Sequence, residues 1–342
     1  MKFDNQTPFP AALELGSTSD IEQLGLLSCR VSYAWDEDGG LSPLPAAEMW
    51  PITRAPQIFE GTLLLPDSDF RRQDIDILVF GDAVAPTGKR AREMRVGVAS
   101  GRFVRQYDVV GDRQWQRLRD DEPWQASTPQ PFESVELAEC RAFGGKASLD
   151  GRQLPFLMNP AGQGFVVEET SIAATPLPNL ERMDRRIEKW DDRPVPACLQ
   201  KPQGGLLLDT SGPGSWEEIG DDGMKLTGAM MRHSFQQAPP DFVCPRGGLG
   251  GDMLLKGFDE SGLIRFALPP EVAKHERGAS AFVEVGALRS SFALRIASLI
   301  VLVPDRRLIV GYTAAFRYMM QPRDVRRTIL RWSGDTHFTL ER

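Results

Sequence analysis

Apolar and polar residues alternate along several short segments of the chain. In residues 94–98 every second residue is apolar, and the alternation resumes in residues 103–109 after a turn at residues 99–102. Successive side chains of a β-strand point to opposite faces, so this pattern predicts a hairpin. Residues 75–79 and 264–268 alternate in the same way and predict two further strands.

Two continuous apolar runs lie close together in the last quarter of the sequence. Residues 299–303 and 308–310 are apolar, and Pro304-Asp305-Arg306-Arg307 separates them. Proline and aspartate favour a type I turn. We therefore expect a second hairpin, whose strands are buried on both faces.

Helical periodicity is confined to two short segments. One helix is predicted from four apolar residues that fall on one helical face, namely Leu180, Met183, Ile187 and Trp190. A second short helix is expected after Pro322, with three residues facing inward, namely Val325, Ile329 and Leu330.

Glycine and proline are abundant, at 32 and 26 residues, and they fall between the short apolar runs. This distribution favours short strands joined by turns. We predict a mostly β fold of antiparallel sheets, β-sandwich-like, with a few short helices. We predict a loop or linker at residues 196–214, between an N-terminal β-rich lobe (1–195) and a C-terminal one (215–342). The alternative is that the two lobes pack as one domain.

The formal net charge of −7 argues against non-specific nucleic-acid binding, which depends on basic patches that neutralise phosphates. Residues 1–6 contain no apolar signal-peptide stretch, and the apolar run 299–303 is far shorter than the roughly 20 residues that span a bilayer. We therefore expect a cytoplasmic protein that binds neither nucleic acid nor membrane.

The cysteines and histidines show no metal-ligand spacing. Cysteines far apart in the sequence are expected to be reduced and to pack as small core residues, namely Cys29, Cys140, Cys198 and Cys244. The histidines are also isolated and are interpreted as structural or exposed, namely His233, His275 and His337. We expect no metal and no cofactor.

Catalytic motifs are also missing from the sequence. There is no G-x-S-x-G elbow and no Walker A pattern, and the glycine-rich residues 247–251 precede a strand-like segment, so we interpret them as a turn. Three pairs of aspartates are candidates for acid–base chemistry, as in glycoside hydrolysis, namely Asp74/Asp76, Asp191/Asp192 and Asp221/Asp222. Such pairs also occur in turns and solvated loops, and we expect no catalytic residue.

Seven short motifs occur in a characteristic order. They are Asp74–Gly88, Val110–Trp115, Arg141–Gly145, Asn159–Phe165, Leu177–Glu181, Ala238–Asp241 and Phe266–Pro269. The second to fifth read as G-D-R-x-W, A-F-G-G, N-P-x-G-x-G-F and L-P-N-hydrophobic-E boxes. Together they resemble a bacterial family of type VI secretion effector adaptors and chaperones, domain-of-unknown-function 2169. One departure is Ala138-Glu139-Cys140, which stands where the family usually has a Trp-Glu pair.

The resemblance implies a cytoplasmic bacterial protein that is not an enzyme. Such an adaptor binds a secreted toxin effector and promotes its loading onto the PAAR/VgrG spike. The acidic net charge is compatible with a basic cargo, since complementary charge speeds encounter.

The motif residues have two interpretations. In the first they define the fold: the glycines form turns, Arg113 is tied by Asp112 or by a backbone carbonyl, and Trp115 packs beneath it. The residues of this interpretation are Gly111, Asp112, Arg113, Trp115, Asn159, Pro160, Gly162, Gly164 and Asn179. In the second they form a groove that grips an extended segment of a partner, and the candidates are Phe143, Gly144, Gly145, Asn159 and Glu181. An edge strand that accepts such a segment is a further possibility.

Two other classes of function remain open from the sequence. One is a structural β-module of an envelope or spike assembly. The other is a β-sandwich hydrolase that acts on carbohydrate through paired carboxylates.

Overall fold

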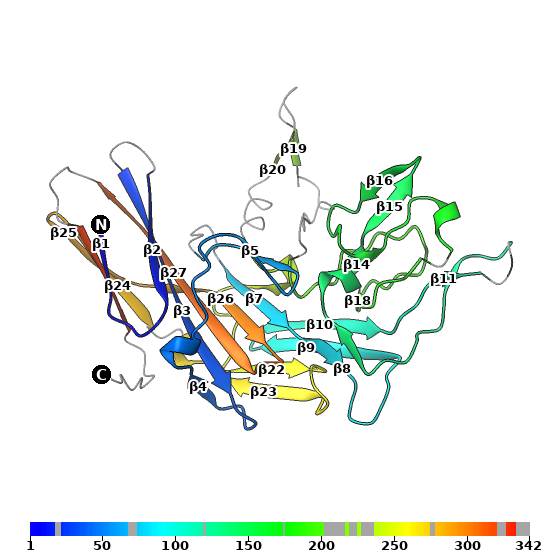
Figure 1. Ribbon diagram of the computed structural model, residues 1–342, viewed down its shortest axis with the longest axis horizontal. Helices are drawn as coiled ribbons and strands as arrows, with labels where there is room; N and C mark the ends of the chain where they lie inside the picture. The colour runs from blue at the N-terminus through cyan, green and yellow to red at the C-terminus, as the bar shows by residue number, and fades with distance from the viewer. Residues whose placement is uncertain are drawn as a thin grey trace.

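The computed structural model describes residues 1–17, 22–67, 74–117, 119, 121–173, 175–201, 216–218, 224–226, 236–273, 278–319 and 326–332. These residues form a mostly β fold, as the sequence predicts (Figure 1). Most strand pairs are antiparallel, and the exceptions among the described pairs are β1–β28, β7–β26 and β14–β17.

The largest sheet joins strands from both ends of the chain. Its order is β2 (Ala11–Ser17), β3 (Glu22–Trp35), β27 (Arg307–Met319), β26 (Arg295–Leu302), β7 (Ile75–Phe80) and β21 (Val243–Cys244), and β4 (Leu41–Pro43) pairs with β3 outside this path. All six residues of β7 are buried. β26 pairs along one edge of this strand, and β21 pairs with Ile75 and Asp76 on the other.

A five-stranded antiparallel sheet packs against the largest one. Its order is β18 (Leu180–Arg182), β10 (Phe103–Val110), β9 (Glu93–Ser100), β22 (Asp252–Lys256) and β23 (Leu263–Ala267). Strands β9 and β10 form the predicted hairpin, and Gly101 supplies the positive φ of 57° that the tight turn requires.

A four-stranded sheet has the order β1 (Lys2–Asn5), β28 (Arg326–Trp332), β24 (Ala279–Val285) and β25 (Leu288–Ala293). The remaining strands form two-stranded pairs, namely β5 (Gln57–Phe59) with β6 (Thr62–Leu64), β8 (Asp82–Val84) with β13 (Ser134–Glu136), β11 (Trp115–Gln116) with β12 (Gln125–Ala126), β14 (Phe143–Gly144) with β17 (Gln163–Gly164), β15 (Lys146–Leu149) with β16 (Arg152–Pro155), and β19 (Trp216–Glu218) with β20 (Met224–Leu226).

Helices are short in the described part of the chain. The α-helix α2 spans Pro270–Ala273, and single 3-10 turns occur at Ala46–Glu48, Glu139–Arg141, Glu169–Ser171 and Pro240–Phe242.

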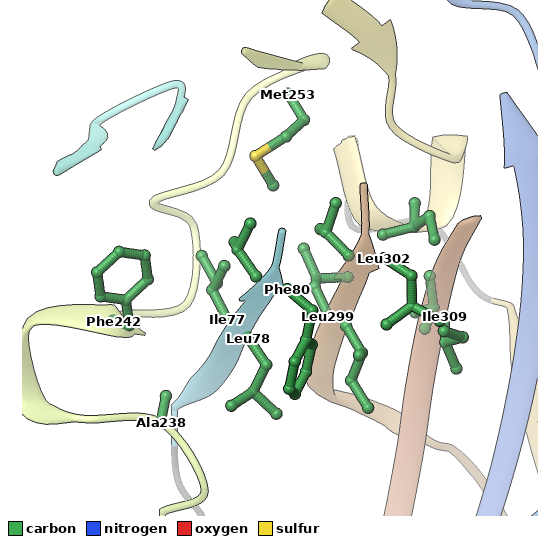
Figure 2. Close-up of a cluster of buried hydrophobic side chains, with 14 of the residues drawn as sticks. Ile77, Leu78, Phe80, Ala238, Phe242, Met253, Leu299, Leu302 and Ile309 are labelled. Carbon is green, nitrogen blue, oxygen red and sulfur yellow. The ribbon is translucent and has the colours of Figure 1, made fainter. Parts of the chain in front are cut away.

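The main core lies between the two largest sheets. Figure 2 shows Ile77, Leu299 and Ile309 from three adjacent strands of one sheet together with Met253 of β22 from the other. Because these side chains are withdrawn from water, their burial supplies the main force that holds the two sheets together.

The C-terminal hairpin prediction is confirmed. Strands β26 and β27 pair antiparallel around the turn at residues 303–306, where Arg306 N donates to Val303 O at 3.1 Å. Their central residues are buried, as the continuous apolar runs predict.

Both helix predictions are wrong within the described residues. Leu180–Arg182 is strand β18, paired with β10, and Met183 is exposed. Ile329 and Leu330 lie in strand β28, between β1 and β24, whereas Pro322 and Val325 lie outside the described residues. In both segments, pairing with strands distant in sequence decides the conformation over the local periodicity.

Strands on both sides of residues 196–214 share the same sheets. In the largest sheet, β26 and β27 from the predicted C-terminal lobe lie between β3 and β7 from the N-terminal one, and β22 pairs with β9 in the five-stranded sheet. Hydrogen bonds therefore join the two predicted lobes. Residues 202–214 of the predicted linker lie outside the described residues.

Candidate functional site

Four of the sequence motifs meet at one place, which we call the motif junction, and it comprises residues 110–115, 139–145, 159–165 and 177–181. The parallel pair β14–β17 aligns Phe143 with Gln163 and Gly144 with Gly164. Single bridges connect Ala142 to Leu180 and Gln114 to Pro176. Segments far apart in the sequence thus form one hydrogen-bonded unit.

Asn179 holds three of these segments together and is fully buried. Its Nδ2 donates to Val110 O at 2.9 Å and to Asp112 Oδ1 at 3.0 Å, and its Oδ1 accepts from Gln163 Nε2 at 3.0 Å. Its backbone N–H donates to Arg141 O at 2.8 Å. A buried amide needs all of these partners, because an unpaired polar group in the core costs free energy.

Asn159 has the same role on the other side of the junction. Its Nδ2 donates to Glu139 O at 2.8 Å and to Phe143 O at 3.1 Å. Its own carbonyl accepts from Gly145 N at 2.8 Å and from Gly162 N at 3.3 Å, in the turn that contains Pro160. Gly144 has a φ of 149°, and a Cβ there would overlap the carbonyl oxygen of Asn159, so glycine fits this close approach.

A buried ion pair crosses the junction. Arg113 Nη2 lies 3.2 Å from Glu181 Oε2, and the two side chains are 8% and 2% exposed. Arg113 also donates to Pro178 O at 3.0 Å, and Glu181 Oε1 accepts from Ile187 N at 3.2 Å. The predicted tie of Arg113 to a backbone carbonyl is confirmed, while its carboxylate partner is Glu181 instead of Asp112.

Trp115 and Phe143 are buried in a second, smaller hydrophobic cluster, whose other buried members are Val166, Ile172, Leu177 and Ile187. Trp115 is therefore a packed core residue, while its position beneath Arg113 stays a prediction.

The structure brings the predicted partner-binding residues together but buries them. The side chains of Phe143, Asn159 and Glu181 are at most 3% exposed, and Gly144 and Gly145 are buried as well. In this conformation Asn159 and Glu181 bond to the protein's own chain, and Phe143 packs in the second hydrophobic cluster. The arrangement supports the interpretation in which the motifs define the fold, and a partner would contact other surfaces.

One such surface is a cavity of about 570 Å³ among four turns of the two large sheets. Its carboxylates outnumber its arginines, and the charged residues are Asp36, Glu37, Asp82, Asp259, Glu260, Arg265 and Arg306. Sequence reasoning missed this cavity because the turns that line it are far apart in the sequence. Its excess of negative charge attracts positively charged groups.

The negative field extends beyond this cavity. The pKa of Glu60 is raised above its usual value, first by burial and then by the negative charges of Asp305, Asp82 and Glu136. A like charge close by disfavours the ionised carboxyl group.

One aspartate in each of two of the predicted pairs holds backbone in place. Asp76 is fully buried and accepts from Gln237 N at 2.9 Å and from Ala238 N at 3.2 Å, which fastens this segment to β7. Asp192 accepts from Glu188 N and Lys189 N in a surface turn. Asp221 and Asp222 lie outside the described residues, as do His233, His275 and His337.

The cysteine prediction is right for three residues and wrong for one. Cys29, Cys198 and Cys244 are buried, and burial raises the pKa of Cys244 to about 11. Cys140 is exposed, because it lies on the outer side of a 3-10 turn. Within the described ranges, no three His, Cys, Asp or Glu side chains gather as a metal site would require.

The glycine-rich turn prediction is confirmed. Gly247 has a φ of 79°, Gly248 O accepts from Arg102 N at 2.8 Å, and strand β22 follows. The described part of the chain contains no helix that is long and apolar enough to span a bilayer.

Comparison of the chain with known protein families gives one match. A family model described as "Uncharacterized protein conserved in bacteria (DUF2169)" matches residues 21–312. The chain belongs to this family. No curated protein and no solved structure matches the chain.

The DUF2169 match contains the whole motif junction and every strand of the five-stranded sheet. Strands β1, β2 and β28 lie outside it. The family-matched region therefore includes the five-stranded sheet, the motif junction and most of the largest sheet.

Proposed function

We propose that this DUF2169 protein is a type VI secretion adaptor, which binds a toxin effector in the bacterial cytoplasm and promotes its loading onto the PAAR/VgrG spike. The observation that carries the proposal is the burial of the polar motif side chains. Arg113, Asn159, Asn179 and Glu181 all bond to the protein's own chain. A scaffold of this kind offers its outer surfaces to other polypeptides.

Two further features support the proposal. The seven motifs resemble the adaptor family in their order, and the residues of four of them build one unit. The acidic cavity and the net charge of −7 complement a basic cargo, and complementary charge mainly increases the rate of encounter.

Affinity purification from the native bacterium tests this proposal. The tagged chain is purified from cells that carry its own gene, and the proteins that co-purify are quantified by mass spectrometry against an untagged strain. We expect a toxin and a PAAR or VgrG protein to be enriched together. Enrichment of envelope proteins alone, or a chain that purifies alone and hydrolyses polysaccharide, would overturn the proposal.

A further inference from the structure

Strand β10 is only partly covered on its outer edge. It has eight residues, and among the described residues β18 pairs with three of them, Tyr107, Asp108 and Val109. β18 ends at Arg182, where the chain turns back and Arg185 N donates to Arg182 O at 3.2 Å. Beyond this point the edge of β10 borders a cavity of about 380 Å³.

The backbone of β10 determines which groups face this cavity. Val110 N donates to Asn179 O at 2.8 Å, on the β18 side of the strand. In an antiparallel ladder alternate residues direct their N–H and C=O groups to the same edge, so those of Val104 and Gln106 also face the β18 side. In agreement, Val104 O accepts a hydrogen bond of 2.8 Å from the guanidinium of Arg105. Both Val104 and Gln106 line the cavity.

The charged side chains of this cavity neutralise one another. Arg182 pairs with Asp241 and lies 3.3 Å from Asp184, and Arg105 donates to the carbonyl of Asp241. Tyr107 also donates from its hydroxyl to Asp241 at 3.2 Å. Two arginines therefore face two aspartates, and the cavity has no excess charge that would select a charged ligand.

Apolar side chains form the exposed part of its walls. Val104 is 50% and Met183 is 44% exposed, beside a strand edge of the kind that proteins commonly protect with charged side chains or proline. On the sheet face, Val104 lies opposite Ala99, and Ala99 lies opposite Leu254, which is also exposed. An apolar row thus continues from the edge across three strands.

We propose that the β10 edge binds an extended segment of a partner polypeptide, which adds a strand beside Val104 and Gln106. The partner's backbone meets the N–H and C=O groups of these two residues, and an apolar side chain of the partner lies between Val104 and Met183. This inference rests on the proposed function, since it names the way in which the adaptor holds its partner.

The test uses substitutions at Gln106, whose side chain is exposed. Gln106→Pro removes the N–H that faces the cavity and leaves the ladder with β9 intact. Gln106→Ala is the matched control, because it removes the side chain and keeps the N–H. The probe is a phage-displayed library of random peptides, selected on the intact wild-type chain, and affinities are measured by fluorescence anisotropy.

We expect selected peptides to bind the wild type and Gln106→Ala equally, and to bind Gln106→Pro about tenfold more weakly, as the loss of one backbone hydrogen bond and the bulk of the ring predict. Hydrogen exchange of the Val104 and Gln106 amides in the wild type should slow when peptide binds, and this readout holds even where Gln106→Pro fails to fold. A library without binders, peptides that do not slow these amides, or wild-type chains that dimerise through this edge would overturn the inference.

The two proposals fail separately. If toxin and spike proteins co-purify with Gln106→Pro as well as with the wild type, the adaptor function stands and the β10 edge is not its binding site. If peptides bind this edge but neither toxin nor spike proteins co-purify from the native host, the β10 edge is a peptide-binding site and the proposed secretion function fails.

Discussion

Arg113 and Glu181 form an ion pair of 3.2 Å between side chains that are almost completely buried. The two residues belong to different sequence motifs, so the contact ties the segment that follows β10 to β18. Removal of one partner leaves the other charge in the interior without compensation, which is more costly than the net contribution of the pair itself.

We therefore expect Glu181→Gln to lower the free energy of unfolding by about 3–5 kcal/mol, measured by urea denaturation. The matched control is Glu133→Gln, which breaks the exposed pair with Arg90 and should cost less than about 1 kcal/mol. An equal effect of the two substitutions would show that the buried pair does not hold the junction.

The second prediction concerns the hydrogen bonds that Asn159 donates. Asn159→Ala removes the donor for Glu139 O and Phe143 O and leaves two buried carbonyls without this partner. We expect the free energy of unfolding to fall by about 2–4 kcal/mol. The exposed Gln153→Ala serves as the control and should change it by less than about 0.5 kcal/mol.

This prediction also separates the two interpretations of the motifs. If Asn159→Ala keeps its stability but loses its partner in a pull-down, then Asn159 contacts the partner directly. If stability falls and binding by the remaining folded protein is normal, then Asn159 holds the fold.

The third prediction concerns how stability depends on pH through Glu139. Its carboxyl group is mostly buried, and among the described residues no hydrogen-bond partner faces Oε2. Burial raises its pKa above the usual 4.5; its own backbone N–H opposes this increase, and the negative charge of Glu136 adds to it. The folded protein therefore holds this proton more tightly than the unfolded chain, and stability is lost as the pH rises from 4.5 through the folded pKa.

We expect Glu139→Gln to raise the melting temperature at neutral pH, because the amide carries no charge to desolvate. The gain should disappear below pH 4.5, where Glu139 is itself neutral. The exposed Glu188→Gln is the control and should leave the melting temperature unchanged at both pH values. If the gain in melting temperature persists below pH 4.5, then packing around residue 139, and not its charge, limits stability there.

Local patterns in the sequence predicted where strands lie better than they predicted which strands pair. The hairpins β9–β10 and β26–β27 are adjacent in sequence, so alternation, apolar runs and turn residues identify them. The parallel pairing of β26 with β7 joins residues that are far apart, and no local pattern specifies it. β28 was mistaken for a helix because neither of its neighbours, β1 and β24, is adjacent to it in the sequence.

The motifs marked the junction but not the role of each side chain. Turn chemistry identified the glycines and Asn159, whereas the ion pair between Arg113 and Glu181 depends on how β10 and β18 align. The acidic cavity and the open edge of β10 escaped sequence reasoning, since both arise where separate loops and strands meet.

The most direct test of the adaptor function is to measure how much spike protein co-purifies with the tagged toxin, in native cells with and without this chain. If the chain joins the two, its deletion should abolish the toxin–spike association and a plasmid copy of the wild type should restore it. If toxin and spike associate to the same extent in the deletion strain, the adaptor account is contradicted.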